Sequence, residues 1–70
     1  MEDIRVRFGL RVRELRIENN LSQEKLAELA EIDRTYITGI ERGKRNVSIT
    51  IMEKLANGLK VSLEFLMRGF

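Results

Sequence analysis

Apolar residues recur at intervals of three and four along most of the chain, which is the period of helices that each bury one side. The first such stripe consists of Ile4, Phe8, Val12 and Leu15. No segment shows the strict alternation of apolar and polar residues that is typical of a half-buried strand. The pattern therefore predicts an all-helical chain, with a first helix that ends at Asn19-Asn20.

Two further helices are expected on either side of a short break. Ser22 is a good N-cap for the second helix. Its apolar stripe consists of Leu26, Ala27, Leu29 and Ala30. The break falls at Glu31-Ile32, and Asp33 is a strong N-cap for a third helix over residues 34–41. Gly43 lies where a left-handed C-terminal cap belongs. Two helices joined by so short a turn must cross steeply.

The rest of the chain predicts two more helices. Ser48 caps a fourth helix, and Val61-Ser62 begins a short fifth one. Their apolar residues are Ile49, Met52, Leu55, Ala56 and Leu59 in the fourth, and Leu63, Phe65, Leu66 and Met67 in the fifth. The chain shows no repeat, low-complexity tract or linker, so residues 1–70 are expected to form one compact five-helix domain.

The third helix has an unusual outer face. At 100° per residue, Ile37, Ile40 and Glu41 lie on one side of it. The opposite face carries Thr35, Thr38, Gly39 and Arg42. Small residues flanked by arginines let a helix approach base edges in the major groove. An ordinary surface helix is the alternative, but Thr-x-x-Thr-Gly is poor helix material, which favours DNA readout.

Composition limits the other possibilities. The 70 residues include no Cys and no His, which excludes disulfides and the common zinc sites and leaves no nucleophile arrangement that we can identify. We therefore expect no enzyme activity, no metal and no cofactor. A core of this size is marginal without such support, so association with a second copy is expected.

Charge is informative only locally, because 13 basic and 11 acidic residues leave a net charge of +2. The segment from Arg34 to Asn46 is basic, which fits either a nucleic-acid surface or a solvated face. No apolar run approaches the roughly 20 residues that span a bilayer. The N-terminus also lacks the apolar run of a signal peptide. A cytoplasmic protein without a membrane partner is expected.

Two spaced segments resemble a known family. They are residues 21–27, Leu-Ser-Gln-Glu-Lys-Leu-Ala, and residues 33–46, Asp-Arg-Thr-Tyr-Ile-Thr-Gly-Ile-Glu-Arg-Gly-Lys-Arg-Asn. Both resemble the lambda-repressor-like, Xre-type helix-turn-helix regulators, and the second most resembles the controller proteins of restriction-modification systems. The likeness extends from about Phe8-Gly9 to Val61-Ser62-Leu63. It implies a compact five-helix lambda-repressor-like DNA-binding domain with its helix-turn-helix at about residues 22–42.

The resemblance also implies a role for each matching residue. Base readout would come from Arg34, Thr35, Thr38 and Gly39. DNA backbone contacts would come from Gln23, Tyr36, Arg42, Lys44, Arg45, Asn46, Ser48 and Thr50. Arg16 and Glu41 would form a structural ion pair between the first and third helices. Other arginines of the first helix are expected on a solvated face, from which Arg11 or Arg13 would be able to approach a phosphate.

Apolar residues in the C-terminal half form a wider surface than one core requires. The predicted homodimer interface consists of Ile51, Leu55, Leu63, Phe65, Met67 and Phe70. The alternative is a satellite cluster folded over the C-terminus. A second stripe on the first helix, Val6, Leu10 and Ile17, is expected either to cover the C-terminal segment or to bind another protein. Lys60 stands where relatives often have glycine, so mild backbone strain is expected there.

Together these expectations describe a homodimeric transcriptional regulator that binds a pseudo-palindromic operator in double-stranded DNA. By resemblance, the operator would control a restriction enzyme gene and the regulator's own gene. Activation or repression, and a contact with RNA polymerase, are left open. The competing interpretation is a protein-interaction module of the antitoxin or immunity type that uses the same fold.

Overall fold

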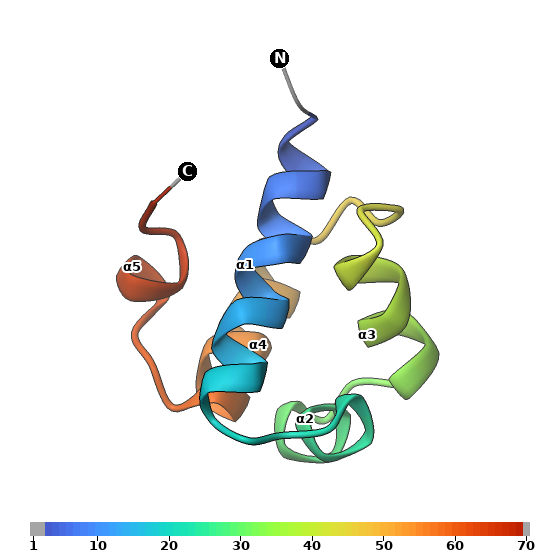
Figure 1. Cartoon of the computed structure of the whole chain (residues 1–70), viewed down its shortest axis with the longest axis vertical. Helices are drawn as coiled ribbons and strands as arrows, with labels where there is room; N and C mark the ends of the chain where they lie inside the picture. Colours follow the sequence, from blue (N-terminus) through green and yellow to red (C-terminus); the bar gives the residue numbers. More distant parts are fainter. Residues whose placement is uncertain (1–2, 70) are drawn as a thin grey trace.

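The computed structural model describes residues 3–69, and within them the chain is helical without a strand. The helices are α1 (Ile4–Glu18), α2 (Gln23–Ala30), α3 (Arg34–Glu41), α4 (Ile49–Leu59) and α5 (Leu63–Leu66). α1 runs through the middle of the molecule, α3 and α5 lie on opposite sides of it, and α2 lies near its C-terminal end (Figure 1). α2 packs against both α3 and α4, and α1 packs against α3. The all-α prediction is confirmed.

Each helix begins at a residue whose side-chain oxygen accepts a hydrogen bond from a backbone N–H of the first turn. These N-caps are Asp3, Ser22, Asp33, Ser48 and Ser62. The caps predicted at Ser22, Asp33 and Ser48 are confirmed. At the opposite ends of α2 and α4, Glu31 and Lys60 have φ angles of 58° and 60°, which is the left-handed conformation. The strain expected at Lys60 is therefore present.

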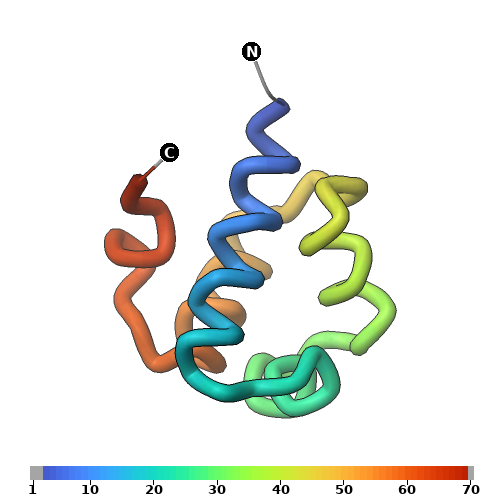
Figure 2. Tube along the Cα trace, in the orientation of Figure 1, coloured from blue at the N-terminus to red at the C-terminus, as the bar shows by residue number. Residues whose placement is uncertain are grey.

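The connection between α3 and α4 passes beside the N-terminal half of α1 (Figure 2). Gly43, in this connection, has a φ angle of 73°, as the predicted left-handed cap requires. A β-carbon at Gly43 would also lie only 2.8 Å from the Val6 Cγ2 atom. Glycine is thus needed twice here, for its backbone conformation and for the close approach to α1.

One apolar core joins all five helices. Its buried members are Phe8, Val12, Leu15, Leu26, Ala27, Ala30, Ile37, Ile40, Leu55, Ala56, Leu59 and Leu66. Leu55 is 0% exposed, so its assignment to a dimer interface is corrected to the core of the single chain. The helical period showed that α4 is apolar on two sides, and it did not show which side faces the core.

Four residues of the predicted apolar stripes are exposed rather than buried: Ile4, Leu29, Ile49 and Met67. Ile4 and Ile49 are the first residues of α1 and α4. Leu29 lies between the buried Ala27 and Ala30 but on the outer side of α2. These positions extend the stripes beyond the surface that the neighbouring helices cover.

Candidate nucleic-acid interface

The turn between α2 and α3 fixes how the two helices cross (Figure 1). The left-handed Glu31 redirects the chain, and the Ile32 N–H donates back to the Ala27 carbonyl at 2.9 Å. Asp33 then starts α3 by accepting a hydrogen bond from the Thr35 N–H at 2.8 Å. Ile37 faces the core and is 0% exposed. The opposite face of α3 is consequently turned outward, as the sequence predicts.

α1 and α3 touch through their backbones. A β-carbon at Gly9 would collide with the Ile40 carbonyl oxygen and lie 3.1 Å from the Glu41 carbonyl oxygen. Gly9 is buried in this contact between the two helices. The absence of a side chain at Gly9 therefore sets how closely α3 is held to the body of the domain.

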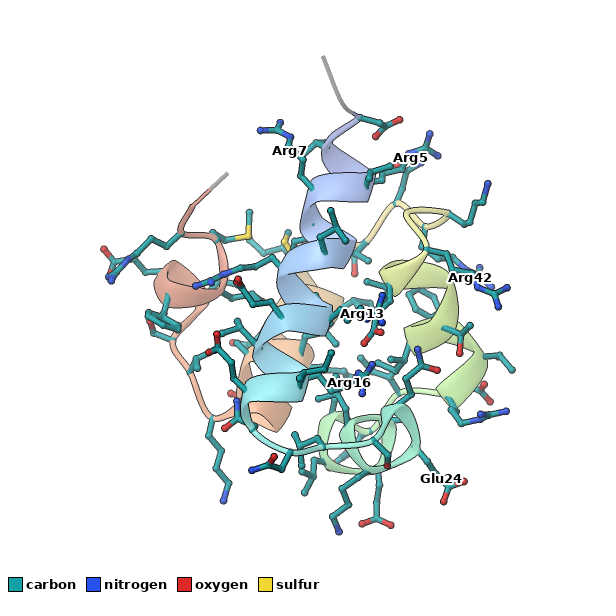
Figure 3. All side chains as sticks on the ribbon, viewed as in Figure 1. Arg5, Arg7, Arg13, Arg16, Glu24 and Arg42 are labelled. Carbon is teal, nitrogen blue, oxygen red and sulfur yellow. The ribbon has the colours of Figure 1, made fainter. Side chains whose placement is uncertain are left out.

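A buried ion pair links the same two helices. Arg16 Nε lies 2.7 Å from Glu41 Oε2, and Arg16 Nη2 lies 3.0 Å from Glu41 Oε1. The third nitrogen, Nη1, donates to the Leu21 carbonyl at 2.8 Å. The side chains are only 14% and 4% exposed, and hydrogen bonding to Glu41 raises the pKa of Arg16 above its ordinary value. The predicted structural pair is present, with Arg16 reaching across from α1 (Figure 3).

Gln23 connects α2 to this pair. Its Nε2 donates to Glu41 Oε1 at 3.1 Å, and its Oε1 accepts from the Thr38 hydroxyl at 2.9 Å. The amide thus supports α3 from the side of α2. A phosphate contact by Gln23 stays a prediction, and it would have to share an amide that already has two partners within the protein.

The first turns of α3 present one free cation and two engaged hydroxyls. Arg34 is exposed, and its side chain makes no ion pair within residues 3–69. The Thr35 hydroxyl donates to the Asp33 carboxylate. The Thr38 hydroxyl donates toward Gln23 and lies 3.2 Å from the Arg34 carbonyl. The readout roles of these residues stay predictions, but Arg34 is the side chain with the greatest freedom to reach a ligand.

Arg45 lies across the middle of α3. Its guanidinium stacks on the Tyr36 ring, 4.7 Å from the ring centre. A β-carbon at Gly39 would lie 3.1 Å from the Arg45 Cγ atom, so the space beside Gly39 is occupied by the Arg45 stem. Sequence reasoning attributed the small size of Gly39 to contact with bases. The structure adds a second reason within the chain that no periodicity would reveal.

The remaining candidates for backbone contact gather where α3 ends and α4 begins. All are exposed: Arg42, Lys44, Asn46, Ser48 and Thr50. Arg42 projects from the end of α3, and Arg13 points toward it from α1 (Figure 3). Both arginines border the shallow hollow above the Arg16–Glu41 pair. Arg42 and Lys44 carry the positive charge of this group, and we call these two residues the cationic rim.

Arg11 does not lie on a solvated face, and that expectation is corrected. Its side chain is 16% exposed and donates to the Phe65 carbonyl at 2.7 Å and to the Leu66 carbonyl at 3.3 Å. It also pairs with Glu14 at 2.8 Å, and its guanidinium lies 4.9 Å from the centre of the Phe65 ring. Arg11 thus fastens α5 to α1. Its main partners are carbonyls far along the chain, so no local sequence signal identifies it.

The other predicted interface residues surround α5. Ile51, Leu63 and Phe65 are half-buried, and Met67 is 36% exposed. Phe70 lies outside the described residues. These side chains pack against the core, as a satellite cluster would, and they still offer apolar surface, as a homodimer interface requires. The homodimer interface therefore stays a prediction.

The second stripe of α1 divides in two. Val6 packs beneath the turn at Gly43, whereas Leu10 and Ile17 are 51% and 53% exposed.

No helix within residues 3–69 is both long and apolar enough to cross a bilayer. The same part of the chain contains no group of three or more acidic, His or Cys side chains arranged to hold a metal ion.

Comparison with known proteins gives consistent results. The family model described as helix-turn-helix matches residues 12–66. Control protein C.MunI of Mycoplasma sp is 48% identical over 64 residues, which cover 90% of this chain and 86% of that relative.

Two solved structures extend the comparison. The crystal structure of the restriction-modification controller protein C.AhdI from Aeromonas hydrophila matches with a TM-score of 0.87 and 49% identity, covering 90% of this chain and 96% of that one. The controller protein C.Esp1396I, solved as a tetramer in complex with its natural 35 base-pair operator, matches with a TM-score of 0.85 and 35% identity over 97% of this chain and 95% of that one.

Proposed function

This chain belongs to the helix-turn-helix family of transcriptional regulators, and from that premise we propose that it is a homodimeric controller of restriction-modification genes and of its own gene. It binds a pseudo-palindromic operator in double-stranded DNA, acts in the cytoplasm and catalyses no reaction. The likeness to C.Esp1396I, which was solved on its operator, supports DNA binding.

The observation that carries this proposal is the contrast between the two sides of α3. Its inner side is fixed to α1 and α2 by the Arg16–Glu41 pair and Gln23, while Arg34 stands exposed on its outer side. A guanidinium in this position suits a bidentate contact with guanine O6 and N7, and such a contact provides about 1–3 kcal/mol of discrimination. Position and chemistry together make α3 a reading helix.

The cationic rim supplies the part of the affinity that does not depend on sequence. Arg42 and Lys44 are exposed and make no ion pair within residues 3–69. Cations that neutralise phosphates release counterions, so operator affinity falls as the salt concentration rises. Phosphate contacts fix the register of the protein on DNA, and base contacts specify the sequence.

Dimerisation through the surface around α5 places two reading helices in successive major grooves, about 34 Å apart. Ile51, Leu63, Phe65 and Met67 provide the apolar part of this surface. From such a dimer, activation requires a contact with RNA polymerase, which transcription in vitro with purified components would reveal.

The test is selection of bound sequences from random duplex DNA at a fixed salt concentration. The wild-type protein is expected to enrich a palindromic motif, and Arg34→Ala is expected to lose the preference at one base pair of each half-site while remaining dimeric. Lys60→Gly is the matched control, because it removes an exposed charge at the C-terminal end of α4 and suits the local φ angle of 60°. Absence of any enriched motif would instead favour the antitoxin or immunity-type interaction module.

A further inference from the structure

The two threonines of the reading helix are chemically more restricted than their residue type suggests. A threonine hydroxyl can donate one hydrogen bond and accept two, so on its own it reads a base edge ambiguously. Which role it plays toward DNA depends on where its single proton is already engaged. The neighbours of Thr35 and Thr38 settle this for both residues.

Thr35 is oriented by Asp33. The carboxylate of Asp33 accepts from both the backbone N–H and the hydroxyl of Thr35. The Thr35 hydroxyl is the main cause that lowers the pKa of Asp33 from its ordinary value of 3.8, so this carboxyl is ionised at neutral pH. An ionised carboxylate has no proton to donate. The hydroxyl of Thr35 must therefore be the donor.

Thr38 is oriented through a chain of three side chains. Both carboxylate oxygens of Glu41 accept hydrogen bonds from Arg16, and Oε1 also accepts from the Nε2 of Gln23, which orients the Gln23 amide. The Oε1 of Gln23 then faces the Thr38 hydroxyl at 2.9 Å. The other neighbour of that hydroxyl, the Arg34 carbonyl at 3.2 Å, is also an acceptor. Both neighbours require Thr38 to donate.

We propose that Thr35 and Thr38 meet the operator only as hydrogen-bond acceptors and methyl groups, and so select against guanine at the bases they contact. The inference rests on the proposed DNA-binding function and specifies its readout. In the major groove, adenine N6 and cytosine N4 are donors and thymine offers a methyl group, whereas guanine offers only acceptors. Guanine recognition is left to Arg34, whose guanidinium has donors only.

The alternative is that both hydroxyls serve the fold alone, by capping and by bridging helices. Valine separates the two cases, because it keeps the shape and a methyl group of threonine and removes the hydroxyl. Thr35→Val and Thr38→Val are each compared with wild type in the selection from random duplex DNA. The matched control is Thr50→Val, at an exposed threonine predicted to contact the backbone, which should weaken binding without changing the motif.

Each valine variant is expected to lose the preference at one pair of symmetric positions, where the wild type disfavours guanine. Where the preferred base is adenine, it is replaced with unsubstituted purine, which lacks the 6-amino group. This replacement should weaken wild-type binding about fivefold. The corresponding valine variant should bind both duplexes equally. The ratio of one protein's affinities for the two duplexes does not depend on how much of that protein is folded. Thermal unfolding of each variant measures any loss of stability separately.

Two results would overturn the inference: an unchanged motif in the valine variants, or a wild-type preference for guanine at the position that responds. Each threonine is judged at its own position. If the wild type itself enriches no motif, the failure lies in the proposed function and not in the polarity of the threonines.

Discussion

α3 and α5 are both short helices, but they are held in different ways: α3 packs against α1 and α2, and α5 packs against α4. α3 is fixed by the Arg16–Glu41 pair, by Gln23, and by backbone contact with Gly9. α5 is a single turn of four residues, anchored by the buried Leu66 and by Arg11 on its last carbonyls. α3 is oriented by hydrogen-bonded side chains of fixed geometry, whereas α5 is held by apolar packing and by the hydrogen bonds that Arg11 donates to its carbonyls.

The difference fits the functions that we propose for the two helices, base readout for α3 and partner binding for α5. Base readout tolerates little error in position, and paired side chains of defined geometry hold α3 in one orientation. α5 is held by the buried Leu66 and by hydrogen bonds to its backbone carbonyls, which every residue possesses, so its exposed side chains can vary without loosening it. A surface for a partner needs that freedom more than it needs angular precision. Removing one support at a time tests this contrast.

The largest effect is expected from Glu41→Ala. It leaves the Arg16 charge in a site where that side chain is 14% exposed and removes a partner from Gln23. Loss of one member of a buried pair costs about 3–5 kcal/mol, and the lower end applies here because Arg16 is not fully buried. Urea unfolding measures the change, with Glu24→Ala on the exposed side of α2 as the control (Figure 3).

If Glu41→Ala costs no more than Glu24→Ala, the ion pair does not hold α3. A double replacement of Arg16 and Glu41 by leucine sharpens the result, since it removes both charges together. It should cost less than the sum of the two single losses, because no uncompensated charge remains in the site.

Gly9→Ala is expected to cost about 2 kcal/mol, as overpacking of a tight core contact typically does. The new β-carbon would collide with the Ile40 carbonyl oxygen, which is backbone and cannot rotate away. α3 must then shift, so operator affinity should fall together with the free energy of unfolding. Leu10→Ala, at a neighbouring site that is 51% exposed, is the control and should change stability by less than about 0.5 kcal/mol. Equal stability of the two variants would contradict close packing at Gly9.

The helix boundaries and the outer face of α3 were accessible from sequence because both depend on local signals. Ser22, Asp33 and Ser48 cap their own helices, and the buried Ile37 and Ile40 define the opposite face by period alone. The Arg16–Glu41 pair was reached only through a family resemblance, since 25 residues separate its members.

What sequence reasoning missed depends on contacts between distant segments. Arg11 was assigned to solvent because its partners are backbone carbonyls, 54 and 55 residues away, which carry no side-chain signature. Leu55 was placed on the surface because an apolar residue on α4 suits a core and an interface equally well. Arg45 beside Gly39 depends on how a polar connection folds back, which helical periodicity does not describe.

Arg11→Met tests how α5 is held, because methionine keeps an apolar stem and removes the donors. Exposing the Phe65 and Leu66 carbonyls to water should loosen α5 by about 1 kcal/mol without unfolding α3. Amide hydrogen exchange should accelerate in α5 and not in α3, and self-association should weaken in sedimentation. Arg13→Met, on the same helix but beside α3, is the control. Uniform acceleration in both helices would show that α5 is not separately held.

The smallest effect concerns the caps. Asp33 caps α3 with a carboxylate, whereas Ser62 caps α5 with a hydroxyl that does not titrate. The pKa of Asp33 is lowered from 3.8, first by the Thr35 hydroxyl and then by the Thr35 N–H. A carboxyl with a lowered pKa stabilises the folded state above its unfolded pKa, and this contribution is lost as the pH falls through the folded value. Acid should therefore loosen the start of α3 through its cap and leave the cap of α5 unaffected.

A titration of the side-chain carboxyl signals by NMR gives the test of this last difference. The Asp33 midpoint should lie below 3.8 in the wild type and move upward in Thr35→Val, which removes the main hydrogen bond and leaves the backbone one in place. Ser62→Ala, which removes the cap of α5, should leave the Asp33 midpoint unchanged. If the Asp33 midpoint is the same with threonine and valine at position 35, the Thr35 hydroxyl does not donate its proton to Asp33. The reading helix would then present a hydroxyl free to donate, and its polarity toward DNA would no longer be fixed in advance.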